Sequence, residues 1–286
     1  MPKALQPIVL TTIALIAFAA NSVLCRMALK DEGVDPSFFT LVRLLSAVGT
    51  LLIIALFTNR MKGLLSQGSW LAGFALFAYA AAFSFGYVSL NTATGALVLF
   101  AAVQLSMLII HSFSGHRISK SELFGGCCAA GGLVYWLLPE LQQPTVFGFL
   151  LMLLAGVSWA FYTVLGRSST DSMSATAANF LRASVMATPL ILLIPEQHSL
   201  GDKGIILAIT SGAIASGLGY VIWYVALKHL SGNRAGLVQL LVPMIAALGG
   251  IIWVNEPITL RLLVAGLLVL GGVYVAMTPW GRVGKN

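Results

Sequence analysis

YVSLNTATG, from Tyr87 to Gly95, recurs 137 residues later as YVALKHLSG, from Tyr224 to Gly232, and both copies lie beside long apolar runs. Three further pairs follow in the same order along each half of the chain. They are Arg26 with Arg167, Arg43 with Arg182, and GGLVYWLLP (131–139) with GGVYVAMTP (271–279). The chain is therefore interpreted as a duplication, and we predict two units, residues 1–140 and residues 141–286. Internal symmetry of this kind is typical of secondary transporters.

The composition indicates a protein that lies in lipid. Hydrophobic residues make up 58% of the chain and charged residues 9%. The mean hydropathy is +0.94, so too little polar surface remains to cover a soluble globule. The net charge of +7 comes from basic residues spaced singly between apolar runs, so membrane lipid, and not nucleic acid, is the expected surrounding. Cys25, Cys127 and Cys128 lie in apolar segments and predict neither a disulfide framework nor a zinc site.

Apolar runs of about 20 residues, long enough to cross a hydrocarbon core of about 30 Å, recur along the chain. They lack the alternation of strands, and lipid tolerates no open sheet edge, so we expect helices. The first run imitates a signal peptide, but it has a counterpart in the second half and is expected to be retained. The predicted fold is an all-α integral membrane protein with ten transmembrane helices. The predicted spans are 8–24, 36–57, 70–89, 95–113, 123–138, 146–166, 175–194, 204–227, 234–254 and 259–277.

Five spans per unit is an odd number, so the second unit enters the membrane from the opposite side. The prediction is two inverted five-helix repeats. Ten Lys and Arg residues fall in alternate links on one side, against Lys30, Lys203 and Arg261 on the other. By the positive-inside rule both termini are cytoplasmic. The ten are Lys3, Arg60, Lys62, Arg117, Lys120, Arg167, Lys228, Arg234, Arg282 and Lys285.

Ten spans in two inverted repeats, the paired YVxL motifs and NEPIT at Asn255–Thr259 resemble the drug/metabolite transporter superfamily, EamA type. The resemblance covers nearly the whole chain, and the overall sequence is most similar to YddG-type exporters of aromatic amino acids. It implies an exporter in the bacterial inner membrane with a central cavity shared by both halves. The family's fourth helix often has a proline after a serine. Ser106 replaces that proline here, while Pro243 keeps it in the ninth helix, which leaves open whether the fourth helix bends.

Candidate site residues are polar or aromatic side chains that share a helical face near mid-membrane. Tyr79 and Phe83 are four residues apart on the third helix, and Tyr79 is close to the middle of its span. Aromatic stripes also suit helix packing, and Asn or Gln also suits hydrogen bonding between helices, so both alternatives stay open. Tyr87, Trp223 and Tyr224 lie near helix ends and suit an interfacial belt or packing. The predicted substrate-binding residues are Asn21, Tyr79, Phe83, Gln104, Ser158, Trp159, Tyr162, Tyr220 and Gln239.

Two pairs of arginines, Arg26 with Arg167 and Arg43 with Arg182, lie within spans or at their edges, where an unpartnered cation is costly. Arg26 and Arg167 are expected to snorkel at helix ends. Arg43 and Arg182 each lie about seven residues inside a helix. They either bind a substrate carboxylate or hydrogen-bond carbonyl groups of helix ends. Their occurrence in both halves favours a shared architectural role.

Two features that the sequence lacks exclude some transport mechanisms. All nine acidic residues fall in links or at helix ends, and the chain has no nucleotide-binding loop, so we expect neither a mid-membrane proton-exchanging carboxylate nor an ATP-driven pump. His111, off-centre in its span, suits a structural or interfacial role. The aromatic interior favours a neutral or zwitterionic, partly apolar solute. We predict export of aromatic and other neutral amino acids or related small metabolites by alternating access, without ion coupling or a cofactor.

Proton-coupled efflux of drugs or other metabolites is the alternative on the same fold, and an intramembrane enzyme or a membrane scaffold are alternatives of other classes. GVSWA at Gly156–Ala160 lacks the second glycine of a nucleophile elbow. No mid-membrane His and Asp accompany its serine, so no catalytic residue is expected. The small-residue surface GGCCAAGG at Gly125–Gly132 could pack another helix closely, and the expected state is a monomer or weak homodimer.

Overall fold

The computed structural model describes residues 5–113, 119–137, 146–195, 201–254 and 260–277, and every regular element in these ranges is a helix. The first half contains α1 (Gln6–Arg26) with its π-helical continuation η1 (Met27–Asp31), α2 (Pro36–Phe57), the 3-10 turn η2 (Leu64–Ser66), α3 (Trp70–Ser89), α4 (Thr92–Phe113) and α5 (Lys120–Leu137). The second half contains α6 (Val146–Arg167), α7 (Ser172–Ala187) with the 3-10 stretch η4 (Thr188–Leu193), α8 (Asp202–Thr210), the π-helix η5 (Ser211–Leu218), α9 (Gly219–Leu227), α10 (Gly232–Gln239), α11 (Val242–Val254) and α12 (Leu260–Met277).

Seven helical segments of the described chain are long and apolar enough to cross a membrane. Two more helices, Thr92–Met107 and Leu263–Ala276, are apolar but shorter. The chain is therefore a multi-pass membrane protein, whereas the count of ten spans and the inverted repeat stay predictions. The seven segments are Gln6–Asp31, Pro36–Phe57, Trp70–Ser89, Val146–Arg167, Ser172–Leu193, Asp202–Leu227 and Arg234–Trp253.

Side-chain caps decide where several helices begin. Asp35 accepts hydrogen bonds from two backbone N–H groups of the first turn of α2, at 2.8 and 3.1 Å. Pro36 follows it and supplies a preset φ at the first helical position. Asp171 caps α7 in the same way, and Ser69 caps α3. Arg43 lies two turns after the cap on α2.

The ninth predicted span is interrupted. α10 ends at Gln239 and α11 begins at Val242. The physical cause is Pro243, which has no N–H to donate to the carbonyl group of Gln239 four residues earlier. In contrast, α4, which has Ser106 in the corresponding place, is continuous. The proline therefore interrupts only one of the two corresponding helices, and it leaves Gln239 at a helix end.

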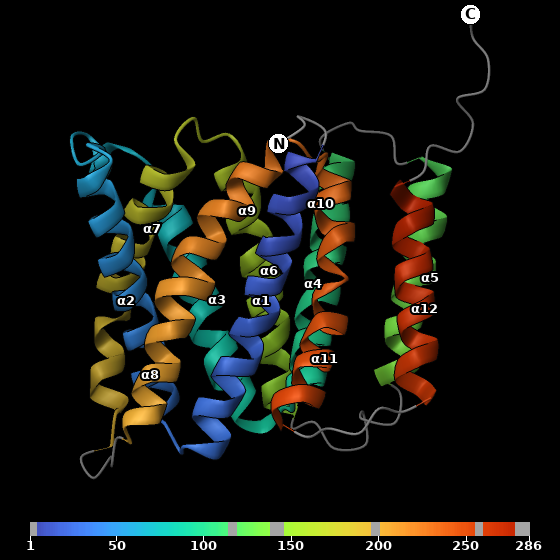
Figure 1. The fold of residues 1–286 in the computed structure, drawn as a ribbon, viewed down its shortest axis with the longest axis horizontal. Helices are drawn as coiled ribbons and strands as arrows, with labels where there is room; N and C mark the ends of the chain where they lie inside the picture. The colour runs from blue at the N-terminus through green and yellow to red at the C-terminus, as the bar shows by residue number, and fades with distance from the viewer. Residues whose placement is uncertain (1–4, 114–118, 138–145, 196–200, 255–259, 278–286) are drawn as a thin grey trace, which may run out of the picture.

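The helices form one bundle with α1, α3, α6 and α9 in its middle (Figure 1). Helices α2, α7 and α8 lie on one side of these four, and α4, α10 and α11 lie on the other. The α5–α12 pair stands at the far edge. α1 begins and α12 ends at the same edge of the bundle (Figure 1). Buried apolar side chains from both halves of the chain form a continuous core through its middle.

The small-residue surface of α5 packs against α12. A Cβ atom added to Gly125 would lie 2.3 Å from the carbonyl oxygen of Gly272, and one added to Gly132 would lie 2.6 Å from Cβ of Leu268. The two backbones approach this closely because neither glycine has a side chain. The surface expected to pack another helix therefore packs one of the same chain, and the oligomeric state stays a prediction.

Candidate functional site

Aromatic side chains from α1, α3, α6 and α9 meet in the middle of the bundle. The ring centroid of Trp159 lies 5.0 Å from that of Tyr79 and 4.6 Å from that of Tyr220. Tyr79 is the tenth of the 20 residues of α3, so the rings lie near the middle of the span. All members are between 0% and 6% exposed, so they exclude solvent from the centre in this conformation. The aromatic cluster, as we term it, consists of Phe18, Tyr79, Phe83, Trp159, Tyr162 and Tyr220.

Two amide side chains border the aromatic cluster. The indole N–H of Trp159 donates to Oε1 of Gln239 at 2.7 Å. Nδ2 of Asn21 donates to the hydroxyl of Tyr79 at 3.5 Å, and the hydroxyl of Ser211 donates to Oδ1 of Asn21. Gln239 and Asn21 are 0% and 1% exposed. The cluster thus has polar groups that carry no net charge at two of its borders.

Arg43 brings a positive charge to the aromatic cluster, although its side chain is only 1% exposed. Its Nε donates to Oγ of Ser216 at 2.9 Å, and its Nη2 donates to the hydroxyls of Tyr79 and Tyr220 at 3.2 and 2.8 Å. The guanidinium carbon lies 4.8 Å from the ring centroid of Phe83 and 5.2 Å from that of Tyr79, within cation–π range. These partners are all neutral groups. A buried cation in a membrane protein with only neutral partners is a candidate functional residue.

The π-helix η5 supplies the two serines of this network. Ser211 at its start bonds Asn21, and Ser216 near its end bonds Arg43. π-Helical turns are rare and frequent at functional sites. Gly212 lets η5 approach α2 closely, because a Cβ atom there would lie 2.1 Å from the carbonyl oxygen of Arg43. The distortion of this helix therefore brings the second half of the chain against α2 beside the buried arginine.

Most of the predicted substrate-binding residues come together here. Gln104 and Ser158 are buried too, at 5% and 8% exposure, but lie outside these contacts. Oε1 of Gln104 faces α10, where a Cβ atom on Gly236 would lie 2.4 Å from it, and has no hydrogen-bond partner among the described residues. Substrate contact stays a prediction for all nine residues. The seven that the contacts connect are Asn21, Tyr79, Phe83, Trp159, Tyr162, Tyr220 and Gln239.

The repeated motif ends a helix beside an arginine in each half. Nη1 of Arg26 donates to the carbonyl oxygen of Tyr87 at 2.7 Å. Nη2 of Arg167 donates to the carbonyl oxygen of Leu230. Both acceptors lie in the copies of the motif that begin at Tyr87 and Tyr224. The two arginines therefore bind backbone carbonyl groups, one in the last turn of α3 and one in the link between α9 and α10.

Arg43 and Arg182 differ in their partners although they are paired in sequence. Nη1 and Nη2 of Arg182 donate to the carbonyl oxygens of Gln67 and Leu65 at 2.8 and 2.7 Å. Its guanidinium also lies 5.8 Å from the ring centroid of Trp70. Arg182 thus holds the link before α3. The shared role expected from the pairing does not hold, because Arg43 donates to hydroxyl groups at the centre of the bundle.

Sequence reasoning missed Phe18, and it left two roles open for the aromatic residues near helix ends. Phe18 precedes Asn21 by three residues on α1, and this spacing on one helical face could have identified it. Tyr87, Trp223 and Tyr224 are 0%, 0% and 3% exposed. Of the two roles considered for them, they therefore pack inside the bundle and do not form an interfacial belt.

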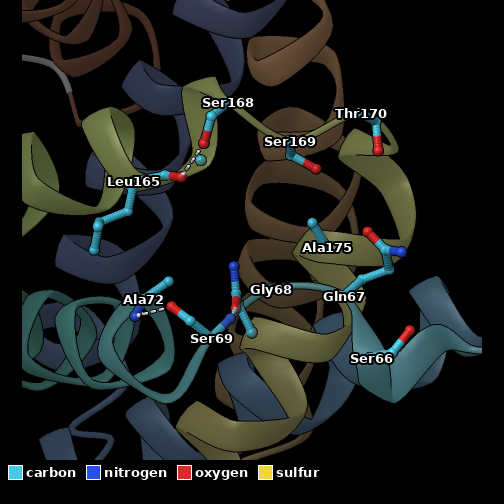
Figure 2. Close-up of a pocket in the computed structure, with 12 residues that line it drawn as sticks. Ser66, Gln67, Gly68, Ser69, Ala72, Leu165, Ser168, Ser169, Thr170 and Ala175 are labelled. Carbon is cyan, nitrogen blue, oxygen red and sulfur yellow. Dashed lines mark hydrogen bonds between the residues drawn. The ribbon is translucent and has the colours of Figure 1, made fainter.

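A polar pocket of about 360 Å³ opens where the link before α3 meets the C-terminal end of α6 and the start of α7 (Figure 2). Gly68 has a φ of +67°, and a Cβ atom there would lie 2.2 Å from Oδ1 of Asn179. That oxygen accepts a hydrogen bond from the N–H of Ser69 at 3.0 Å. The next residue on α7, Phe180, lies 5.5 Å from Tyr220, ring to ring. One turn of α7 therefore connects the pocket wall with the aromatic cluster.

The described residues give no metal site. Within them no three His, Cys, Asp or Glu side chains come together. Cys25 is buried as a free thiol, and Cys127 and Cys128 on α5 are free as well. The side chain of His111 lies outside the described residues.

Comparison with known proteins places this architecture in a family. Residues 146–278 match the EamA-like transporter family. Over 280 residues the chain is 44% identical to an uncharacterized protein of Pseudomonas aeruginosa, and the match covers 98% of this chain and 96% of the relative. It is 24% identical over 279 residues to an uncharacterized transporter of Archaeoglobus fulgidus, covering 93% and 95%. It is 25% identical over 227 residues to a probable amino-acid metabolite efflux pump of Escherichia coli, covering 72% and 75%.

A solved crystal structure with 20% sequence identity superposes with a TM-score of 0.75, over 93% of this chain and 97% of that one. That likeness shows a common fold. The family match over residues 146–278 and the relatives that are named as transporters identify the chain as a transporter of small molecules. The chain belongs to the EamA-like transporter family.

Proposed function

We propose that this protein exports aromatic and other neutral amino acids, or related small metabolites, from the cytoplasm across a bacterial inner membrane. The observation that carries the proposal is the aromatic cluster, buried in the middle of the bundle and bordered by the amides of Asn21 and Gln239. Such rings can stack on an aromatic side chain, and amides can bind a charged backbone group without adding net charge. The E. coli relative whose name is probable amino-acid metabolite efflux pump supports this cargo.

The proposed mechanism is alternating access between two inverted repeats, residues 1–140 and 141–286. The cluster draws on helices of both units, and its members are shielded from solvent. This suits a conformation in which the central site is closed. The polar pocket at the α6–α7 end lies on the side that the distribution of Lys and Arg predicts to be cytoplasmic. A solute would enter there and reach the centre when α3 and α6 part from α7.

Transport without a coupled ion is the third part of the proposal. All nine acidic residues fall outside the predicted spans, and the charged group at the centre is Arg43, which stays protonated at physiological pH. A proton exchanger needs a group that titrates during its cycle. The solute's own gradient then drives export.

Counterflow in liposomes that contain the purified protein tests the cargo and the drive. We expect radiolabelled phenylalanine and tryptophan to enter liposomes preloaded with the same amino acid faster than they enter protein-free liposomes. An imposed pH gradient at matched internal pH should leave the final distribution unchanged. Accumulation above equilibrium that a protonophore abolishes would overturn the uncoupled mechanism. Flux confined to nucleosides or cationic drugs would overturn the cargo.

Paired spin labels test alternating access. One pair, at Ser66 and Thr170, reports on the polar pocket, and a second pair, at Asp31 and Asp202, reports on the opposite end of the same bundle. Labels are placed in a variant that lacks the three cysteines. We expect one distance to lengthen when the other shortens. Simultaneous lengthening at both ends would indicate a channel.

A further inference from the structure

We propose that Arg43 binds the carboxylate of the transported solute, so that the substrates are carboxylates with an apolar or aromatic body. This inference rests on the proposed function and identifies which chemical group the central site requires. Among the residues that the structure describes, the arginine has no anionic partner. The two ion pairs of the described residues, Arg60 with Asp171 and Lys203 with Glu32, lie elsewhere.

The hydrogen bonds of Arg43 leave one edge of the guanidinium available. Nε and Nη2 donate to the hydroxyls of Ser216, Tyr79 and Tyr220. Nη1, which has two further N–H donors, is buried and has no hydrogen-bond partner among the described residues. A carboxylate that binds through both of its oxygens takes two parallel N–H groups from adjacent guanidinium nitrogens. Nη1 and Nη2 form such an edge, and the hydroxyl partners of Nη2 can yield to a stronger, charged acceptor.

The surroundings of that edge suit the rest of such a solute. The guanidinium carbon lies 4.8 Å from the ring centroid of Phe83. Tyr79, which bonds Nη2, lies 5.0 Å from Trp159, ring to ring. A solute whose carboxylate binds Arg43 therefore has its apolar body among the rings. If the solute is an amino acid, the amide oxygens of Asn21 and Gln239 are acceptors for its ammonium group.

Arg182 provides an internal contrast. It occupies the corresponding place in the second half, but it is bonded to the carbonyl oxygens of Gln67 and Leu65 and lies only partly buried. Its donors hold a link in place, whereas those of Arg43 converge on the cluster. The contrast makes Arg182→Gln a matched control for Arg43→Gln, since both changes remove one arginine from corresponding helices.

The experiment compares solutes that share a phenyl ring and differ in charged groups, in counterflow with the wild-type protein. Phenylalanine carries both groups, 3-phenylpropionate lacks the amine, and 2-phenylethylamine lacks the carboxylate. We expect 2-phenylethylamine to move at least 10-fold more slowly than the two carboxylates. In Arg43→Gln the flux of both carboxylates should fall at least 10-fold, while that of 2-phenylethylamine stays the same. Arg182→Gln should leave the ratios among the three solutes unchanged.

Equal wild-type flux of phenylalanine and 2-phenylethylamine would overturn the role of Arg43, and so would an Arg43→Gln variant that slows all three solutes by one factor. If Arg43→Gln does not fold, the wild-type comparison decides alone. A result in which 3-phenylpropionate moves and no amino acid does would refute the proposed amino-acid cargo and support the carboxylate site. If amino acids and amines moved alike, the amino-acid cargo would be supported and the carboxylate site refuted. The failure of one proposal can therefore be told from the failure of the other.

Discussion

The indole N–H of Trp159 and the side-chain oxygen of Gln239, 80 residues apart in sequence, form a buried hydrogen bond of 2.7 Å. Nε2 of the same Gln239 donates to the carbonyl oxygen of Ala235 at 2.9 Å, one turn earlier. Gln239 is the last residue of α10, directly before the interruption that Pro243 causes. The bond therefore connects Trp159 of the aromatic cluster with the end of α10, which is where Pro243 interrupts the helix.

Loss of this bond should destabilise the protein measurably. Gln239→Leu leaves the buried indole N–H without an acceptor, which costs about 1–3 kcal/mol in the free energy of unfolding. Combining it with Trp159→Phe removes the orphan donor, so the double variant should lose about 1 kcal/mol less than the sum of the single losses. Denaturant titration in detergent micelles measures all four proteins. Additive losses would show that the bond contributes nothing.

Removing one ring from the aromatic cluster should change selectivity. Tyr79 contacts the rings of Phe83, Trp159 and Tyr220, and each ring pair is worth about 0.5–1.5 kcal/mol beyond burial. Tyr79→Ala should lower the kcat/KM for phenylalanine and tryptophan about 2- to 10-fold more than that for alanine or serine. Phe57→Ala, at an 83% exposed position of α2, is the control. A uniform loss for all amino acids, accompanied by lower protein yield, would indicate that Tyr79 only packs.

Two glycines of α5 should differ sharply on substitution by alanine. At Gly125 a Cβ atom would lie 2.3 Å from the carbonyl oxygen of Gly272, whereas at Gly131 nothing lies within 4 Å. Gly125→Ala should force α5 and α12 apart and cost about 1–3 kcal/mol. Gly131→Ala should be neutral, or stabilising by up to about 1 kcal/mol from helix propensity. Thermal unfolding midpoints compare the two variants, and equal midpoints would contradict the close packing of α5 on α12.

The ion pair between Arg60 and Asp171 should make stability depend on pH in acid. Burial alone would raise the pKa of Asp171, but hydrogen bonds from Ser174 and the charge of Arg60 outweigh it, and the pKa is lowered. A carboxyl group whose pKa is lower in the folded state stabilises the folded protein. Its contribution to the free energy of unfolding is complete above the unfolded pKa of about 3.9, and it is lost as pH falls through the folded pKa. Asp171→Asn retains a cap for α7 and removes the charge.

Between pH 6 and pH 3, the unfolding midpoint of Asp171→Asn should therefore fall less than that of the wild-type protein. Asp202→Asn, at the start of α8 on the opposite edge of the bundle, is the control. Identical acid profiles for Asp171→Asn and the wild type would show that this carboxyl group does not contribute.

Some predicted helix starts coincide with the observed ones, whereas α7 begins at Ser172, three residues before the predicted start at Ala175. The starts of α2 at Pro36 and of α3 at Trp70 coincide with the prediction, because Asp35 and Ser69 provide the caps. The π-helix η5 had no such signal, since its SGAIASGL composition suits an ordinary apolar helix. It lies where Gly212 approaches α2 closely, which is a contact between segments far apart in the chain.

The candidate site could be predicted only as far as helical spacing reaches. Periodicity on single helices identified Tyr79, Phe83 and Tyr220, because those faces are set by local sequence. It could not separate Arg43 from Arg182, because each lies in a similar apolar helix and their partners come from distant segments. Gln104 lies outside the contacts of the aromatic cluster and faces Gly236, and its contact with substrate stays a prediction.

The buried guanidinium of Arg43 also has an electrical consequence. A zwitterionic solute adds no net charge to the site, so a complete transport cycle moves no charge and is indifferent to membrane potential. A solute with a carboxylate and no ammonium group carries one negative charge outward on each cycle. That charge is worth about 2.3 kcal/mol across 100 mV, about a 50-fold bias at equilibrium. An inside-negative potential would therefore help to drive the export of acids, whereas amino acids would move only down their own concentration gradient.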